Sequence, residues 1–198
     1  MTTTSIARLK VVLDEVEPPV MRRIEVPLTL RLDRLHTVLQ VAIGWTDSHL
    51  YEFRIKGIGF GVPDPEYGYG DGPLDARKAT LLDVIEDTGA KSFKYLYDFG
   101  DGWEHSIKIE RIEPATIGLD YPRLLDASGA CPPEDIGGPW GYQDVRDVVA
   151  DPNHERHAEM AEWWDVDSLD PTFVNIPAIE AELVKLARRW ARKPRAKK

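Results

Sequence analysis

One segment, residues 93–109, constrains the fold more than any other part of the chain. Apolar side chains occupy every second position on both sides of Gly100-Asp101-Gly102. Alternation with a period of two predicts β-strands, and the glycine-rich centre predicts the turn of a hairpin. Because the buried face fixes the register of such a pair, we predict a three-residue loop. That loop pairs Phe99 with Trp103, Tyr97 with His105 and Tyr95 with Ile107.

The rest of the chain mixes the periods of strands and helices. Alternation predicts strands over residues 6–16 and 20–26, joined at Glu17-Pro18-Pro19, and over residues 49–55. Helical spacing predicts a helix over residues 30–43, with Thr29 as its N-cap and Gly44 at its end. Further helices are expected over residues 81–87, 141–150, 154–164 and 177–192.

This order of elements predicts an α+β fold. We expect a mostly antiparallel sheet with a β-β-α-β start and a later β-hairpin, covered by helices and followed by a helical C-terminal third. The sheet core is expected in residues 1–125. A loop and helical part, residues 126–192, should pack on the same domain, and residues 193–198 form a basic tail.

The composition excludes several classes of protein. Cys131 is the single cysteine, which rules out an intramolecular disulfide framework and a zinc site made of cysteines alone. No apolar run approaches the length that spans a membrane, and the polar start Met1–Ser5 leads into no apolar signal-peptide core. We therefore expect a cytoplasmic protein without a membrane partner.

The charge is distributed unevenly along the chain. Residues 188–198 hold seven of the 25 basic side chains and no acidic one, so the other 18 basic residues stand against all 34 acidic ones. An acidic body repels the phosphate backbone, so we expect nucleic acid to bind, if at all, only through the tail, residues 188–198. The alternative for the tail is a solvated helix end whose cations suit the helix dipole.

Three ordered segments carry a family resemblance. They are residues 35–53, residues 94–110 (KYLYDFGDGWEHSIKIE) and residues 130–142 (ACPPEDIGGPWGY). Together they resemble the plasmid pRiA4b ORF-three-like family, also described as an insertion-element passenger protein of TnpR type. The resemblance covers residues 6–185 and implies an α+β fold and an association with plasmids and mobile elements. A serine resolvase needs a nucleophilic serine near activating arginines, and the sequence shows no such cluster.

Two short segments gather acidic and aromatic side chains and form the candidate binding site. The first is the hairpin end, where the predicted register also sets Asp98 opposite Glu104, and the second is the loop that follows residue 130. The candidate residues are Asp98, Asp101, Trp103, Glu104, His105, Cys131, Glu134, Asp135, Trp140 and Tyr142. Five carboxylates in two short segments are costly for simple turns. We therefore predict that the two segments lie against each other.

Several kinds of chemistry fit these residues. A divalent metal ion suits Asp98, Asp101 and His105, with His49 as a further ligand, because carboxylates and imidazoles are common metal ligands. His49 and His105 could instead converge with Cys131 on zinc, or one of them could serve Cys131 as the base of a nucleophile. A purely structural role for each residue, as a turn or core-edge group, also remains open.

The leading hypothesis for function is a non-catalytic binding or interaction module, encoded by a mobile element or its host. Its partner would be a protein or a small molecule, recognised by the hairpin end and the loop at residues 131–142. The alternative is a metal-dependent hydrolase or nuclease that uses Asp98, Asp101, His105, Glu134 and Asp135.

Overall fold

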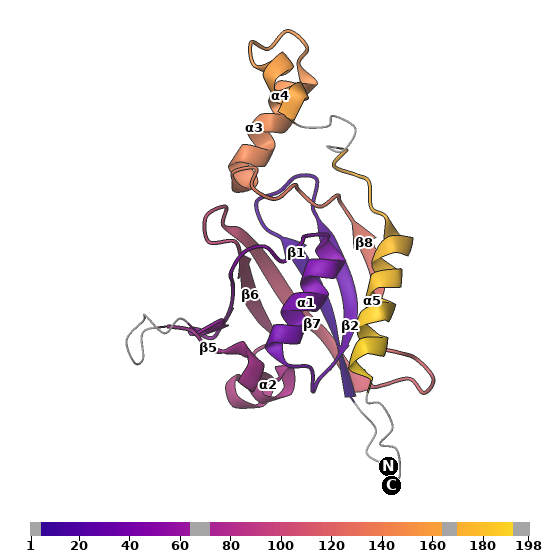
Figure 1. Ribbon diagram of the computed structural model, residues 1–198. Coiled ribbons are helices and arrows are strands. Elements are labelled where there is room, and N and C mark those ends of the chain that lie inside the picture. Colours follow the sequence, from indigo (N-terminus) through magenta and orange to yellow (C-terminus); the bar gives the residue numbers. More distant parts are fainter. Residues whose placement is uncertain (1–4, 64–71, 164–169, 192–198) are drawn as a thin grey trace.

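The computed structural model describes residues 5–63, 72–163 and 170–191. Its centre is one eight-stranded sheet with the strand order β5-β4-β3-β6-β7-β1-β2-β8 (Figure 1). Neighbouring strands are antiparallel except β4 and β5. The strands are β1 (Ser5–Leu13), β2 (Met21–Pro27), β3 (Tyr51–Ile55), β4 (Ile58–Gly61), β5 (Leu74–Asp75), β6 (Ser92–Tyr97), β7 (Trp103–Pro114) and β8 (Arg123–Ser128).

The helices confirm the α+β prediction. They are α1 (Leu32–Ile43), α2 (Leu81–Thr88), α3 (Gly138–Ala150), α4 (His157–Trp163) and α5 (Ile176–Trp190), with the short 3-10 helix η1 (Ala76–Lys78) before α2. α1 and α5 lie across the sheet, whereas α3 and α4 stand beyond one end of it (Figure 1). Buried side chains of α1, α5 and β1 belong to one hydrophobic core. Within the described ranges, no helix is long and apolar enough to cross a bilayer.

α1 ends where the sequence predicts but starts differently. Gly44 follows its last residue with a φ of 122°, a conformation that favours glycine. The N-cap is Arg31, which makes no side-chain capping bond, so the prediction of Thr29 is wrong. At the C-terminus the buried Arg22 donates to the carbonyl oxygens of Ala42 and Ile43. A cation at this end is stabilised by the helix dipole.

The predicted hairpin register is wrong by two residues. β6 and β7 pair Tyr97 with Trp103 and Tyr95 with His105, so the loop holds five residues, 98–102. The predicted buried face is retained, because Tyr95, Tyr97, Trp103 and His105 are all fully buried. Phe99 is 54% exposed instead of paired.

The cause of this shift is the backbone of Asp98. Its φ of 57° takes the chain out of the strand, and its Oδ1 atom accepts a hydrogen bond from the N–H group of Gly100. The N–H group of Gly102 then donates to the carbonyl oxygen of Asp98 and closes the loop. Asp98 and Glu104 are therefore not opposite each other: Glu104 pairs with Leu96 in the ladder.

Candidate functional site

Three loops meet at the end of the sheet near α3: the His49 loop (residues 45–50), the hairpin loop (residues 98–102) and the proline loop (residues 131–137). The Asp98 N–H group donates to the carbonyl oxygen of Leu50 over 2.9 Å. The Gly137 N–H group donates to Oδ2 of Asp101 over 3.2 Å. The predicted contact between the hairpin end and the segment after residue 130 is thus confirmed. We call this place the three-loop junction.

Glu134 ties the proline loop to the other two elements. Its Oε1 atom accepts a hydrogen bond from the Tyr97 hydroxyl at 2.5 Å, and its Oε2 atom accepts from the N–H and hydroxyl groups of Thr46. The Tyr97 hydroxyl also accepts from the Ser48 N–H group. Burial, and then the Glu134 carboxylate, raise the pKa of Tyr97 far above its usual range, so the phenol stays protonated and donates. Both carboxylate oxygens of Glu134 are therefore already in use.

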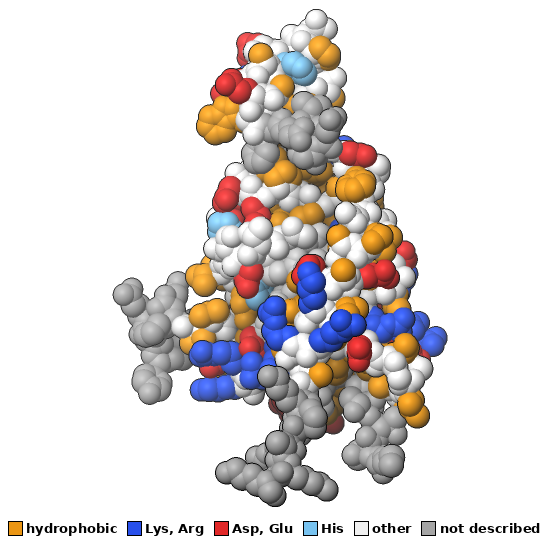
Figure 2. All heavy atoms as spheres, turned by 45° about the vertical axis from the view of Figure 1, so that its right-hand side comes forward, with side chains coloured by type: hydrophobic (Ala, Val, Ile, Leu, Met, Phe, Trp, Pro, Cys, Tyr) orange, Lys and Arg blue, Asp and Glu red, His pale blue; other side chains and the backbone are white. Residues whose placement is uncertain are grey.

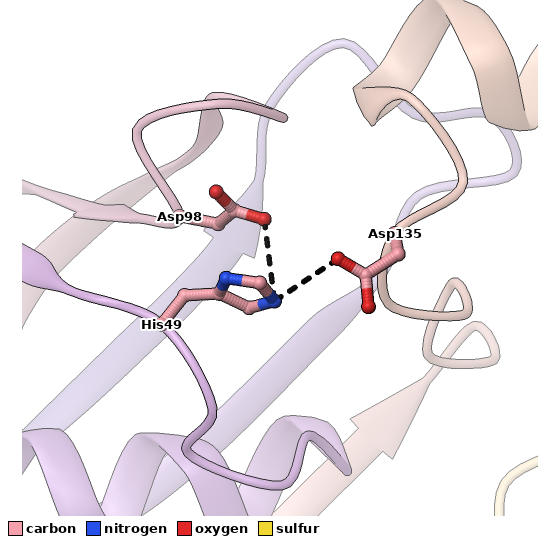
Figure 3. A group of neighbouring side chains, drawn as sticks. All are labelled: His49, Asp98 and Asp135. Atoms are coloured by element: carbon pink, nitrogen blue, oxygen red, sulfur yellow. Dashed lines mark ion pairs between the residues drawn. The ribbon is translucent and has the colours of Figure 1, made fainter.

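His49 faces two carboxylates at the junction (Figure 3). Its Nε2 atom lies 3.6 Å from Oδ2 of Asp98 and 3.2 Å from Oδ1 of Asp135. The ligand atoms of these three residues all lie within 4.8 Å of one another. Within the described parts of the chain, no other group of His, Cys, Asp and Glu side chains converges in this way.

Both aspartates of this group have a left-handed backbone conformation. Asp98 and Asp135 have φ values of 57° and 59°, which few residues other than glycine, asparagine and aspartate adopt readily. Asp98 uses Oδ1 to hold its own loop and leaves Oδ2 for His49. Each residue comes from a different loop, so the cluster exists only when all three loops are in place.

A buried network positions the His49 loop, and the sequence did not reveal it. His36 on α1 lies 2.6 Å from Oδ1 of Asp47 and 2.7 Å from the hydroxyl of Tyr95. Gln40 donates to the same hydroxyl and accepts from the Asp47 N–H group. Burial lowers the pKa of His36, so the ring is held neutral. The helical spacing of His36 and Gln40 was a signal that both face the sheet, but their partners come from distant segments.

Two of the predicted site residues lie in the core instead. His105 and Trp103 are fully buried, and Nδ1 of His105 lies 3.2 Å from the carbonyl oxygen of Tyr95. The His105 ring packs edge-on against Trp45, with ring centroids 5.3 Å apart. Burial lowers the pKa of His105 to about 4. The hairpin register turns both side chains inward, so His105 is not part of the His49 cluster.

The remaining candidates are divided between surface and core. Glu104 forms an ion pair with Lys94 at 3.3 Å, away from Asp98. Trp140 is 83% exposed at the start of α3, whereas Tyr142 is buried and has the guanidinium of Arg146 over its ring. The structure therefore brings Asp98, Asp101, Glu134 and Asp135 together, with Trp140 on the adjacent helix.

Cys131 is not grouped with either histidine. Its side chain packs against Gly44 and lines a cavity of about 600 Å³ with Arg22 and Phe173. Burial raises the pKa of its thiol to about 12, so the reactive thiolate is disfavoured. This environment speaks against the zinc and nucleophile hypotheses for Cys131.

Comparisons with known proteins agree with the fold. A family model described as plasmid pRiA4b ORF-3-like protein matches residues 5–178. The chain is 61% identical over 193 residues to "Uncharacterized protein y4hQ" of Sinorhizobium fredii (strain NBRC 101917 / NGR234), covering 98% of each chain. A crystal structure of a protein of unknown function, MM3350 from Methanosarcina mazei Go1, superimposes with a TM-score of 0.76 at 32% identity. That match covers 89% of this chain and 98% of the other.

Proposed function

Since this chain belongs to the plasmid pRiA4b ORF-3-like family, whose description names no activity, we propose its function from the site: a non-catalytic module that binds a divalent transition-metal ion. The ligands would be Nε2 of His49 and one carboxylate oxygen each of Asp98 and Asp135. A histidine with two carboxylates suits zinc and manganese among the biological metals.

The spacing of the ligand atoms is the observation that carries this proposal. Zinc bonds of about 2.0–2.2 Å place two ligands of a tetrahedral site about 3.3–3.6 Å apart. The distances from His49 to Asp98 and Asp135 are 3.6 and 3.2 Å. Both distances fit a zinc ion, and the third pair of ligand atoms, from the two aspartates, lies within 4.8 Å.

An ion pair of a protonated His49 with the two aspartates is the competing explanation. It would be expected to include a hydrogen bond from Nε2, because a charged imidazole donates through both nitrogens. The Nε2 atom is buried, yet it makes no hydrogen bond with any described residue. The nearby oxygen atoms of Asp98 and Asp135 do not complete a hydrogen bond with it. A lone pair aimed at a cation satisfies this atom better.

The proposal differs from the hydrolase hypothesis in the residues that it needs. That hypothesis used His105 and Glu134, but His105 is fully buried and Glu134 is bound to Tyr97 and Thr46. A metal held by one residue from each loop would instead fasten the three-loop junction. The Asp135 side chain is 76% exposed, so open coordination positions on that side would face solvent, where an oxygen ligand of a partner can bind.

Calorimetric titration of the full chain, after treatment with EDTA, tests the proposal with ZnCl₂ and MnCl₂. We expect one bound ion per chain. His49→Gln and Asp135→Asn should each lower the affinity by about tenfold or more, since losing a ligand costs at least as much as losing its outer support. Asp120→Asn, which removes an exposed loop carboxylate elsewhere, should leave the affinity unchanged. Equal binding by all variants, or none by the wild type, would contradict the proposal.

A further inference from the structure

A row of six cationic side chains crosses the molecule at the end opposite α3 and α4. Figure 2 shows Lys and Arg side chains gathered in the lower half of one face, below most of the acidic ones. The row, which we call the basic strip, consists of Arg77, Lys78, Arg31, Arg34, Arg188 and Arg189.

Packing of three helices makes the basic strip continuous. The N–H group of Leu32 donates to the carbonyl oxygen of Ala79, which sets η1 beside the start of α1. Arg34 then reaches α5, where its guanidinium lies 5.1 Å from the centroid of the Trp190 ring. Arg188 and Arg189 are exposed in the last turn of the same helix.

The strip carries more positive charge than its neighbours neutralise. Asp33 pairs with Arg31, and Asp75 is shared by Arg77 and Lys78. Arg34, Arg188 and Arg189 form no ion pair with any carboxylate of the described residues. The side chains of Arg77 and Lys78 remain 67% and 82% exposed, so the charge is available to a partner.

We propose that the basic strip docks on the phosphate backbone of a nucleic acid. Five of its six cations are arginines, whose planar guanidinium binds phosphate oxygens in pairs. The most acidic part of the chain, residues 131–170, has eleven acids and two arginines, and α3 and α4 within it lie at the far end (Figure 1). Because charge is screened over about 8 Å in physiological salt, repulsion from that end does not reach the strip.

Nucleic acid would then bind to the folded body as well as to the C-terminal residues 188–198 that the sequence suggested. The sequence after Ala191 adds five more basic residues, directly after the last turn of α5. These five residues lie outside the described part of the chain, and their charge would add to the attraction for phosphate. Contacts to phosphates do not depend on the base sequence, and the affinity that they give falls steeply as the salt concentration rises.

Fluorescence anisotropy with a labelled random-sequence DNA duplex of about 20 base pairs tests this proposal on the full chain. Between 50 and 200 mM salt we expect affinity to fall by about tenfold or more. The triple variant Arg77→Gln, Lys78→Gln, Arg189→Gln should weaken binding at low salt and reduce the salt slope by about three. Lys10→Gln, Lys91→Gln, Lys108→Gln, an equal charge change away from the strip, is the matched control.

Two further measurements separate other partners. A chain lacking residues 193–198 should keep a weaker but still salt-sensitive affinity for the duplex. If that deletion abolishes binding while the triple variant binds like the wild type, the tail acts alone and the proposal is wrong. Binding to phosphatidylserine vesicles without binding to the duplex, or binding that does not respond to salt, would overturn it as well.

Discussion

At the scale of single residues, each of the two aspartates of the candidate metal site has two roles in the proposal. Each adopts an unusual backbone conformation, and each would supply a carboxylate oxygen to the metal ion. Asp98 and Asp135 both adopt positive φ values, which cost most side chains about 1–2 kcal/mol. Aspartate and asparagine tolerate this conformation better than other non-glycine residues. Asparagine is therefore the substitution that removes the charge and preserves the loop, and alanine would confuse the two effects.

Tyr97 is a fully buried residue of the hairpin, and its removal should destabilise the fold strongly. Its ring is fully buried and its hydroxyl binds Glu134 and Ser48, so Tyr97→Ala should lower the free energy of unfolding by about 3–5 kcal/mol. Tyr97→Phe, which removes only the hydroxyl, should cost about 1–3 kcal/mol. Phe99→Ala is the control, since that ring is exposed and should cost little. Urea unfolding measures all three, and an equal loss for Phe99 would argue for the register predicted from the sequence.

His105 should make stability depend on pH. Burial lowers its pKa from 6.5 to about 4, so between these values the unfolded chain binds a proton that the folded chain does not. The free energy of unfolding therefore falls as the pH drops through this window, by about 3 kcal/mol from this residue, and is unaffected above it. His105→Gln should flatten the profile measured by urea unfolding at pH 4 to 7. An unchanged profile in this variant would contradict the prediction.

At the scale of elements, Gly138 decides how closely the hairpin loop approaches α3. A Cβ atom on this residue would lie 2.1 Å from the carbonyl oxygen of Asp101, and its φ is +71°. Gly138→Ala should therefore destabilise the fold by more than the 1–2 kcal/mol of the backbone strain alone and weaken metal binding. Gly57→Ala is the control, because Gly57 also has a positive φ but a Cβ atom there would have no neighbour within 4 Å. Its loss of stability therefore measures the backbone strain alone. Equal losses for the two variants would show that the loops separate without cost.

The elements themselves were predictable because their apolar periods are local. β1, β2, α1 and α5 appear close to the expected ranges, and α2 (Leu81–Thr88) extends one residue beyond the expected 81–87. The hairpin register could not be predicted in the same way, because two registers bury the same face of the strands. Only the left-handed backbone conformation of Asp98 selects between them. β8 was missed, since Arg123–Ser128 has no clear alternation and pairs only through the distant β2.

The candidate site was predictable in part. The sequence has five carboxylates in two short segments, which is unfavourable for simple turns, and from this we correctly predicted that the hairpin end and the proline loop meet. His49 and Asp98 were expected among the metal ligands, together with Asp101 and His105. Their grouping with Asp135 did not follow, because three segments far apart in the chain have to converge.

At the scale of the whole molecule, residues 193–198 should be dispensable for folding. They lie outside the described residues, and the buried stripe of α5 is complete at Leu186 and Ala187. Deleting them should change the melting temperature by less than about 2 °C. Differential scanning calorimetry of the full and shortened chains measures this. A larger drop would mean that the tail packs on the body.

The central place of β1 has a consequence for how the protein is made. β1 leaves the ribosome before the other described strands, yet it pairs with β2 on one edge and with β7 on the other. The nascent chain can form the first hairpin at once, but the other edge of β1 stays open until Trp103–Pro114 has been synthesised. An open edge is a template for pairing with other chains. We therefore expect that translation speed between β1 and β7, and chaperones that shield this edge, change the yield of protein with the native sheet.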